Sequence, residues 1–390
     1  MYGMADSSTA SYRRQFRAWR NTRRLQGELK SAAARFAVGG LSIPGDDDIR
    51  SILSRRFPDS QPRPQGTLNI IAIYHHYNWE NESLLPSLEK FGTVRHYDWF
   101  AEFNHQQERA WHDRVKADMN RALVALVERW HKEAAADVIF TYLSGALVTM
   151  ETMARIKSFG VPTVNLSLND KENFVGKIKN GQATGMRDIC RYFDLCWTST
   201  EDALKKYRVA GALPLYLPEG ANPDIHQPYA GERTIDVSFV GQKYGNRTEI
   251  IEGLQRAGIP VAAFGYGWPN GPLATEEMVR LYSKSRINLG FGGVSGHSQT
   301  YCLKGRDFEV PMSGGLYLTE YHEELAKVYQ VGREITTYRN FAELLDNIRY
   351  LLANPQKAEE IRQNGFQRAR SEHSWEMRLG KIFKLMGVLA

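Results

Sequence analysis

Two cations and a carboxylate stand close together in the second half of the chain, at Lys304, Arg306 and Glu309. The surrounding pattern predicts a helix that begins at about Asp307, so both cations precede its first turn. The free N–H groups and the dipole of a helix N-terminus favour anions, and lysine and arginine add charge and hydrogen-bond donors. These residues predict a phosphate site. The structural alternative is a solvated helix start with local ion pairs.

Glu309 falls one turn into the predicted helix, where its carboxylate can reach the same site. A carboxylate beside a phosphate is suited to accept hydrogen bonds from vicinal hydroxyls, such as those of a ribose. The preceding loop is rich in glycine, which lets a ligand approach the backbone closely. Its candidate ligand-binding residues are Gly292, Gly293 and His297. Together these features predict a site for a nucleoside diphosphate.

A second glycine turn begins at Gly241 and leads to Arg247 at the start of another predicted helix. A lone turn of this kind is a weak signal. We expect Gly241 and Arg247 to form the other wall of the nucleotide site. The alternative is that Arg247 is a surface residue of a helix start.

The elements that position these residues alternate between strands and helices along most of the chain. Near-continuous apolar runs are typical of strands buried on both faces of a parallel sheet. The first half has such runs at 68–74, 94–98, 137–143, 162–168 and 195–199, with a long helical region at 102–135. The second half has them at 237–240, 261–264, 287–291 and 316–319, followed by helices at 341–353 and 356–370. This alternation predicts an α/β fold of doubly wound domains.

Ligands of such domains bind beyond the carboxyl ends of the strands. His75 follows the first predicted strand and Asp170 follows the fourth, so both can face one crevice. A histidine there could stabilise charge or take a proton from an acceptor, and an aspartate could act as a base. We take His75, Asp170 and Lys304 as the catalytic candidates. For His75 and Asp170 the alternative is a structural or turn-forming role.

The first part of the chain differs from a nucleotide-binding domain. Residues 11–30 carry seven cations and the single acid Glu28, with Tyr12, Phe16 and Trp19 on one face at helical spacing. A basic amphipathic helix of this kind could lie on an anionic membrane surface, or pack on its own domain with a solvated basic face. Residues 42–66 read as a linker with one short helix, and a proline-rich stretch at 216–228 marks a second boundary. The predicted segments are 1–65, 66–217, 218–371 and 372–390.

The composition is that of a globular protein with room for two cores, since 42% of its 390 residues are hydrophobic. The formal net charge of +6 suits an acidic substrate, an anionic membrane surface or nucleic acid. Three cysteines without metal-type clustering fit a reduced cytosolic protein. No apolar run approaches the roughly 18–20 residues of a transmembrane helix. We therefore expect a cytoplasmic protein, with peripheral contact at the inner face of the membrane as an option.

Several spaced motifs resemble those of one known family. Residues 304–320, KGRDFEVPMSGGLYLTE, resemble the C-terminal half of GT-B glycosyltransferases, in particular the CgeB-like group typified by a spore-maturation protein. The resemblance extends to 236–247, 338–344, 350–355 and 373–375, and it covers roughly residue 194 to the C-terminus. One position departs from the pattern: many retaining members carry a glutamate where this chain has Cys302. The stereochemistry of the reaction therefore stays open.

The resemblance implies two Rossmann-like domains facing a central cleft, with a helical N-terminal extension and a final helix that returns to the first domain. It also implies transfer of a sugar from a nucleotide sugar to a hydroxyl of a glycan, a lipid-linked intermediate or a protein, as in polysaccharide biosynthesis. We expect no cofactor and no metal ion. Two alternatives remain: a nucleotide-sugar epimerase of the same fold, and a noncatalytic sugar- or nucleotide-binding protein. Nucleic acid is disfavoured, because the cations concentrate in one helix without a recognised binding motif.

Overall fold

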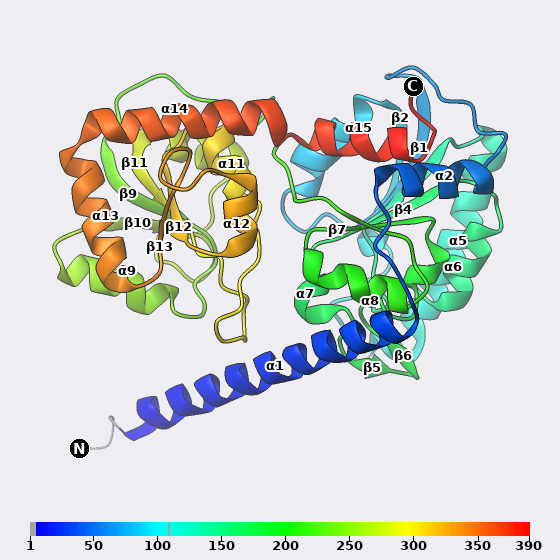
Figure 1. Ribbon diagram of the computed structural model, residues 1–390, viewed down its shortest axis with the longest axis horizontal. Helices are drawn as coiled ribbons and strands as arrows, with labels where there is room; N and C mark the ends of the chain where they lie inside the picture. Colours follow the sequence, from blue (N-terminus) through cyan, green and yellow to red (C-terminus); the bar gives the residue numbers. More distant parts are fainter. Residues whose placement is uncertain (1–4, 108–109) are drawn as a thin grey trace. The chain divides into compact units, whose positions relative to one another are not determined.

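The computed structural model describes residues 5–107 and 110–390, and it describes only the backbone of residues 5–12 and 14. The chain divides into two compact units, each built on a parallel sheet (Figure 1). The first unit contains residues 27–218 and 375–390, and the second contains residues 219–374 and the chain up to residue 26. The divisions thus lie at 26/27, 218/219 and 374/375, the first of them within the predicted segment 1–65.

The first unit contains a six-stranded parallel sheet with the strand order β2-β1-β3-β4-β7-β8. Its strands are β1 (Leu68–Ile73), β2 (Gly92–Tyr97), β3 (Val138–Thr141), β4 (Thr163–Ser167), β7 (Leu195–Thr198) and β8 (Pro214–Tyr216). Five of the six match the apolar runs in the sequence. The strand β8 was not predicted, because a three-residue edge strand that begins with proline has no extended apolar run. A small antiparallel pair, β5 (Ile178–Lys179) and β6 (Gln182–Ala183), stands apart from this sheet.

Helices cover both faces of this sheet, so the strands are buried on both sides. One face packs against α2 (Asp46–Arg56), α3 (Leu85–Glu89) and α15 (Trp375–Leu385). The other packs against α5 (Lys116–Glu133), α6 (Met150–Lys157) and α8 (Leu204–Val209). Trp375 anchors α15 by stacking on Trp79, with ring centroids 4.9 Å apart and planes 9° from parallel. The last helix of the chain is thus part of the first unit's core.

The prediction of one helix over 102–135 was wrong at its beginning. The described helical turns start with a π-helix, η3 (Trp111–Val115), and continue into α5. Upstream, the side chain of Asn104 accepts the backbone N–H of Gln106, which forms a turn. His105 is drawn inward, where its ring accepts the indole N–H of Trp99 at 3.1 Å.

The second unit contains a five-stranded parallel sheet with the order β10-β9-β11-β12-β13. Its strands are β9 (Ile235–Val240), β10 (Val261–Phe264), β11 (Ser285–Leu289), β12 (Tyr317–Glu320) and β13 (Thr336–Tyr338). Its helices are α9 (Arg247–Arg256), α10 (Thr275–Lys284), α11 (Arg306–Met312), α12 (Glu323–Val328), α13 (Phe341–Ala353) and α14 (Pro355–Glu372). The short elements α12 and β13 were not predicted, because neither is long enough to show a periodic pattern.

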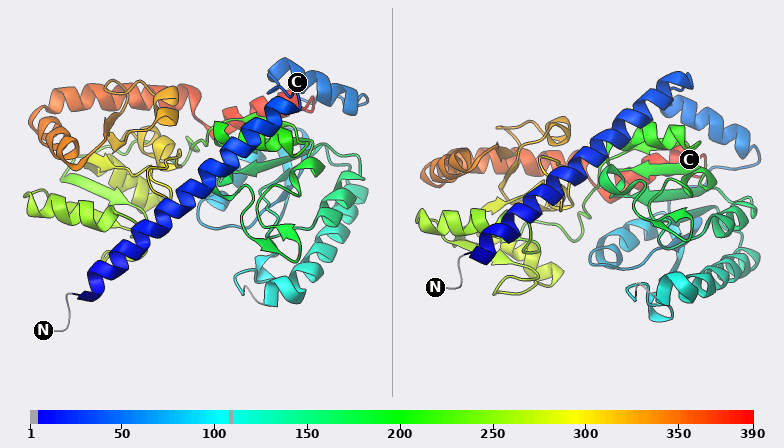
Figure 2. Two further views of the ribbon diagram at one scale, coloured as in Figure 1. Left: turned by 60° about the horizontal axis from the view of Figure 1, so that its bottom comes forward. Right: turned by 90° about the horizontal axis from the view of Figure 1, so that it is seen from below.

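The N-terminal helix α1 (Ala5–Val38) is one unbroken helix, longer than the predicted segment 11–30 (Figure 2). Phe16 and Trp19 stack on each other and remain 63% and 48% exposed, and the guanidinium of Arg23 lies over the Trp19 ring. The side chain of Tyr12, predicted to share this face, lies outside the described residues. Contact of this face with an anionic membrane stays a prediction.

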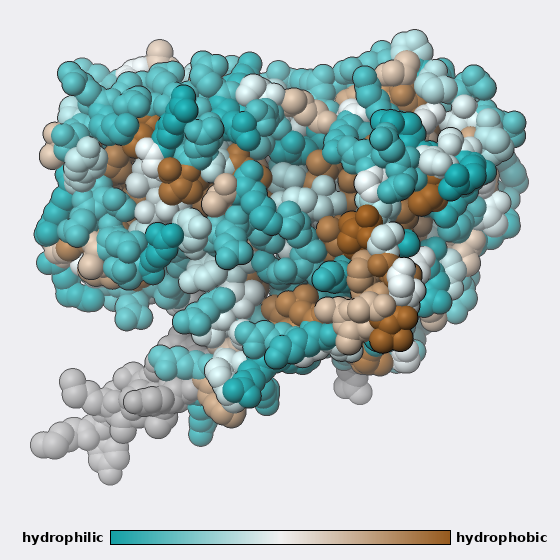
Figure 3. Space-filling view, in the orientation of Figure 1, coloured by the Kyte–Doolittle hydropathy of each residue, from teal (hydrophilic) through white to brown (hydrophobic). Residues whose placement is uncertain are grey.

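The face of the molecule in Figure 3 is mostly hydrophilic, with apolar patches that are most frequent in the right-hand half of the view. Among the residues that the structure describes, no helix is both long and apolar enough to cross a membrane.

Candidate functional site

The strand order of the second unit changes direction between β9 and β11. Ligands of open parallel sheets bind where neighbouring strands lead off in opposite directions, beyond the carboxyl ends. Gly241 follows β9 at this point, and the glycine loop that contains Gly292 and Gly293 follows β11. The topology therefore brings the two predicted glycine segments to the same edge of the sheet.

Two arginines meet at Gly241. A Cβ atom at this glycine would lie 3.0 Å from Nη1 of Arg306 and 3.4 Å from Nη1 of Arg247, so a larger residue would displace the guanidinium groups. Both guanidinium groups also lie over the ring of Phe239, at 5.6 Å for Arg306 and 5.3 Å for Arg247. The indole N–H of Trp268 donates to the Gly241 carbonyl at 2.9 Å and fixes the turn.

Neither arginine has a carboxylate within ion-pair distance in the described part of the chain. Arg247 donates to the Gln242 carbonyl at 2.8 Å and to the Tyr244 hydroxyl at 2.9 Å. The buried Nε atom of Arg306 has no hydrogen-bond partner among the described residues. Burial and the neighbouring Arg306 lower the pKa of Arg247 to about 10.

Arg247 is buried and Arg306 is partly buried. Burial lowers the pKa of Arg306, but nearby groups that include Glu309 and Asp307 outweigh it and raise the pKa, although neither carboxylate comes within ion-pair distance. Two adjacent guanidinium groups of this kind could bind an anion.

Lys304 extends the cationic cluster, and carboxyl groups lie beside it. Its ammonium group donates to the Cys302 sulfur at 2.9 Å. A Cβ at Gly305 would lie 3.0 Å from Oε1 of Glu309 and 3.6 Å from Oε2 of Glu219, so both carboxyl groups reach this turn. Burial raises the pKa of Glu219 to about 8; Lys304 opposes this rise and Glu309 adds to it. Glu219 was not among the predicted ligands, although the resemblance implied that Glu219, Gly220 and Asn222 would lie by the cleft.

The N-terminus of α11 offers fewer free backbone N–H groups to an anion than the sequence predicted. The helix has only seven residues, and the backbone N–H of Lys304 is taken by the Asp307 carboxylate at 2.8 Å. Asp307 also accepts the Tyr317 hydroxyl at 2.7 Å, and burial raises its pKa to about 6. The positive charge of the site therefore comes mainly from side chains rather than from a helix dipole.

The glycine loop is held as a hairpin. Cys302 donates its backbone N–H to the Gly292 carbonyl at 3.0 Å, and Gly293 donates to the Glu320 carboxylate at 3.0 Å. The ring of Phe291, just before the loop, lies 5.6 Å from the guanidinium carbon of Arg247. His297 lies partly buried near the tip, where its Nδ1 is 3.1 Å from the Ser295 carbonyl. The arginines, Lys304 and Glu309 thus form one cluster, whereas the recorded contacts of His297 stay within its own loop.

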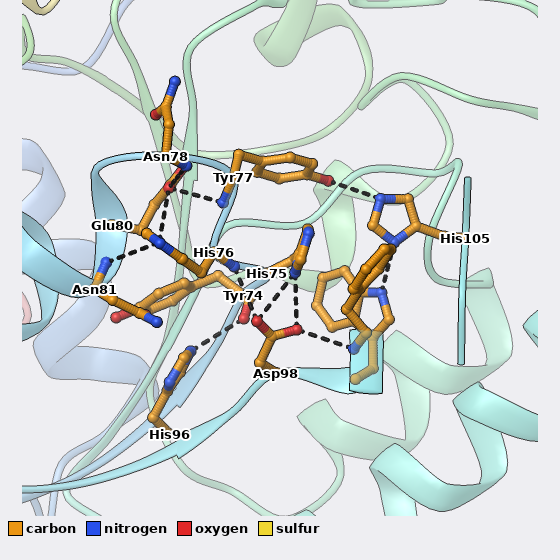
Figure 4. A network of polar contacts seen from close by, with 12 residues as sticks. Tyr74, His75, His76, Tyr77, Asn78, Glu80, Asn81, His96, Asp98 and His105 are labelled. Atoms are coloured by element: carbon orange, nitrogen blue, oxygen red, sulfur yellow. Dashed lines mark hydrogen bonds and ion pairs between the residues drawn. The ribbon is translucent and has the colours of Figure 1, made fainter. Parts of the chain in front are cut away.

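The first unit has a second group of polar residues at the carboxyl ends of β1 and β2 (Figure 4). Nδ1 of His75 lies 2.9 and 3.0 Å from the two carboxylate oxygens of Asp98. Asp98 also accepts the backbone N–H groups of His76 at 3.0 Å and Phe100 at 2.9 Å. Burial alone would raise the pKa of Asp98, but these hydrogen bonds outweigh it and hold the pKa below its ordinary value.

An ionised Asp98 accepts a hydrogen bond from Nδ1–H, which keeps the proton on Nδ1 and leaves the lone pair of His75 on Nε2. In Figure 4 this second nitrogen points away from Asp98, and the structure shows no hydrogen-bond partner for it in the described chain. The ring stacks on Phe100 at 4.4 Å and lies edge-on to Tyr77 at 4.6 Å. Burial and the neighbouring His75 lower the pKa of His105 to about 4, so His105 is neutral. The pair can act as a base held in one orientation.

Asp98 was missed as a partner, although the sequence placed it at the end of a strand. The apolar run 94–98 predicts β2, but only the sheet order places β2 directly beside β1. Strand neighbours in a parallel sheet bring their carboxyl ends together. A sequence gives the strand ends without the order in which the strands pair.

A pocket of about 440 Å³ in the same unit is lined mainly by residues that follow β1, β3 and β4. Neither His75 nor Asp98 lines it, but Tyr77, whose ring lies 4.6 Å from that of His75, does. The ring of Tyr77 is half exposed.

Asp170 lies on the wall of the pocket, where its carboxylate accepts the Tyr207 hydroxyl at 2.6 Å and the Ser167 hydroxyl. Burial raises the pKa of Asp170. Its catalytic role stays a prediction, and these hydrogen bonds give it a structural one.

Metal-binding side chains do not gather at either site. Among residues 5–107 and 110–390, no group of three or more histidine, cysteine, aspartate or glutamate side chains could hold a metal ion. Cys190 and Cys196 are buried free thiols, and Cys302 is partly exposed.

Comparison with known proteins gives one family match in sequence. Residues 247–384 match the family described as glycosyl transferase-like. This stretch contains Arg247, Lys304, Arg306 and Glu309. No curated protein sequence matches the chain.

Solved structures share the fold at low sequence identity. Sucrose-phosphate synthase from Thermosynechococcus elongatus aligns with a TM-score of 0.58 and 12% identity, over 82% of this chain and 98% of that one. A glycosyltransferase from Rickettsia africae aligns with a TM-score of 0.57 and 10% identity, over 82% and 98%. HepE from Anabaena, in complex with UDP and glucose, aligns with a TM-score of 0.53 and 12% identity, over 82% and 100%.

Proposed function

Because the chain has the GT-B fold of two Rossmann-like domains and a glycosyl transferase-like C-terminal domain, we propose that it transfers a sugar from a nucleoside-diphosphate sugar to an acceptor hydroxyl. The observation that carries this proposal is the adjacent pair Arg247 and Arg306, which has no carboxylate within ion-pair distance in the described chain. A diphosphate supplies the missing negative charge. The complex of HepE with UDP and glucose supports a donor of this type. The CgeB-like group is the subfamily that we propose within this fold.

The donor binds in the second unit. Arg247, Arg306 and Lys304 contact the diphosphate and stabilise the charge that develops on it as the glycosidic bond breaks. These three cations supply that charge without a metal ion. Glu309 accepts hydrogen bonds from the ribose hydroxyls.

The acceptor binds in the pocket of the first unit. Its walls carry the aromatic rings of Tyr77 and Tyr142 and the amide groups of Asn78, Asn169 and Asn173. Aromatic faces and amide groups suit the apolar faces and hydroxyls of a sugar. The described lining contains the acids Glu80 and Asp170 and no lysine or arginine. We therefore propose an uncharged glycan as acceptor, whose hydroxyl loses its proton to Nε2 of His75.

A thermal-shift screen with UDP, GDP, dTDP, CDP and ADP tests this function. We expect one nucleotide to raise the melting temperature, because ligand binding to the folded state stabilises it. Lys304→Ala and Glu309→Ala should each reduce the shift, since they remove a phosphate and a ribose contact. The matching sugar nucleotide is then incubated with uncharged oligosaccharides. Donor conversion without a second substrate would indicate an epimerase, and no shift at millimolar nucleotide would contradict the proposal.

The affinity for the nucleotide should fall as the pH rises through about 8. Burial keeps the pKa of Glu219 at about 8, so its side chain is neutral at pH 7. At pH 9 its carboxylate would pair with Lys304 and repel the diphosphate, which should raise the dissociation constant about tenfold. Because the pKa of Glu219 is higher in the folded than in the unfolded protein, the free energy of unfolding should also decrease as the pH rises from the ordinary glutamate pKa to about 8. Calorimetric titration at both pH values measures the affinity. Glu219→Gln should remove the dependence, and an unchanged slope would assign it to another group.

A further inference from the structure

The N-terminal helix contacts the glycine hairpin of the second unit. Asn21 donates its side-chain N–H to the Gly296 carbonyl at 2.9 Å. The Thr22 hydroxyl donates to the Ser298 carbonyl at 3.0 Å and accepts the Ser298 N–H at 2.9 Å. Thr22 also lies 3.5 Å from the Thr300 hydroxyl. Two neighbouring side chains of α1 thus form hydrogen bonds with the tip of a loop that is 275 residues away in the sequence.

The tip needs such support. Gly296 and Gln299 both have left-handed backbone conformations, with φ of 72° and 47°. A left-handed conformation is unfavourable for a residue other than glycine, and it persists where surrounding contacts determine it. The hydrogen bonds from Asn21 and Thr22 to Gly296 and Ser298 provide contacts of this kind.

The base of the same hairpin leads directly to the donor site. Val294 donates its N–H to the Thr300 carbonyl at 2.8 Å, and Cys302 donates to the Gly292 carbonyl at 3.0 Å. These bonds fix the ends of the hairpin relative to its tip. The Cys302 sulfur then accepts the ammonium group of Lys304 at 2.9 Å. A continuous series of contacts therefore runs from α1 through the hairpin to a phosphate-binding lysine.

We propose that Asn21 and Thr22 are positioning residues for the nucleotide sugar, acting through the 292–302 hairpin on Lys304. This inference rests on the proposed function, because it concerns the same donor site. The part of α1 up to residue 26 then supports the donor site of the second unit. Its exposed aromatic and basic face takes no part in this role.

Calorimetric titration of the full chain with the nucleoside diphosphate chosen by the thermal-shift screen tests the proposal. The double variant Asn21→Ala/Thr22→Val should raise the dissociation constant about tenfold, since three hydrogen bonds to the hairpin are lost. Thr22→Ser keeps the hydroxyl and should bind within about twofold of the wild type. Gln26→Ala, an exposed amide on the same helix, is the matched control and should bind normally. In turnover assays the double variant should raise KM for the donor and leave kcat nearly unchanged.

Arg306→Ala separates failure of this inference from failure of the function. If the wild type binds no nucleotide, the proposed function fails. If the wild type binds, Arg306→Ala does not and the double variant binds as tightly as the wild type, the positioning role is overturned. Equal losses in Thr22→Ser and Thr22→Val would also overturn it, because the hydroxyl would then make no difference. Thr22→Val alone serves as a milder variant, and its melting temperature shows whether the fold is retained.

Discussion

Replacing Arg306 with alanine should weaken nucleotide binding about 100-fold and reduce turnover to background. A guanidinium group makes several charge-assisted hydrogen bonds to a phosphate, each worth roughly 1.5–3 kcal/mol. The melting temperature should change little, because the change relieves the repulsion between Arg306 and Arg247 but also removes the attraction of Arg306 to Glu309 and Asp307. Loss of binding without loss of stability would show that the residue serves the ligand rather than the fold. Calorimetric titration and thermal unfolding measure the two effects.

Arg349→Ala is the matched control, because Arg349 is an exposed arginine in the same unit. It should change neither the affinity nor the melting temperature. Arg306→Lys keeps the charge but loses the planar donor geometry, so an intermediate affinity is expected. Nucleotide affinity within twofold of wild type in Arg306→Ala would contradict the assignment of the anion site.

Replacing His75 with alanine should lower kcat by about 10²–10⁴-fold, the range that a general base contributes. Nucleotide binding should be unchanged, since the donor residues belong to the second unit. Asp98→Asn should also reduce kcat, because an amide no longer fixes the tautomer that leaves the lone pair on Nε2. The measurement is release of nucleoside diphosphate from the sugar donor in the presence of the acceptor.

A matched control for His75 is His131 in α5, whose ring accepts the backbone N–H of Ala136. His131→Gln should retain wild-type turnover. Asp170→Asn tests the second predicted base in the same assay. Normal kcat in His75→Ala together with loss in Asp170→Asn would transfer the role of base to Asp170.

Apolar runs were sufficient to predict most of the fold. The runs at 68–74 and 261–264 correspond to β1 and β10, because a strand buried on both faces must be apolar throughout. The three-residue strands β8 and β13 carry too few residues for any such pattern. The start of the helix predicted at 102 failed for another reason: tertiary contacts of His105 override the helical pattern there.

Lys304, Arg306 and Glu309 could be grouped from the sequence because they are close together in it, and their role as a donor site stays a proposal. That Arg306 and Arg247 share the space above Gly241 follows only from the strand order. The hydrogen bonds of Asn21 and Thr22 to the 292–302 hairpin could not be predicted from the sequence, since the helix and the hairpin are far apart in the chain. Contacts of this kind are specified by the complete fold rather than by any segment.

The docking of α15 sets an order for folding during synthesis. Trp375, Leu379 and Phe383 complete the same core as Leu68 and Ile70, although the whole second unit lies between them in the sequence. The first unit emerges from the ribosome early, but the part of its sheet face that α15 covers stays exposed until this last helix has been made. Until then, that exposed apolar face is a target for chaperones and a site of aggregation. Removing the C-terminal residues should therefore damage the unit that was synthesised first.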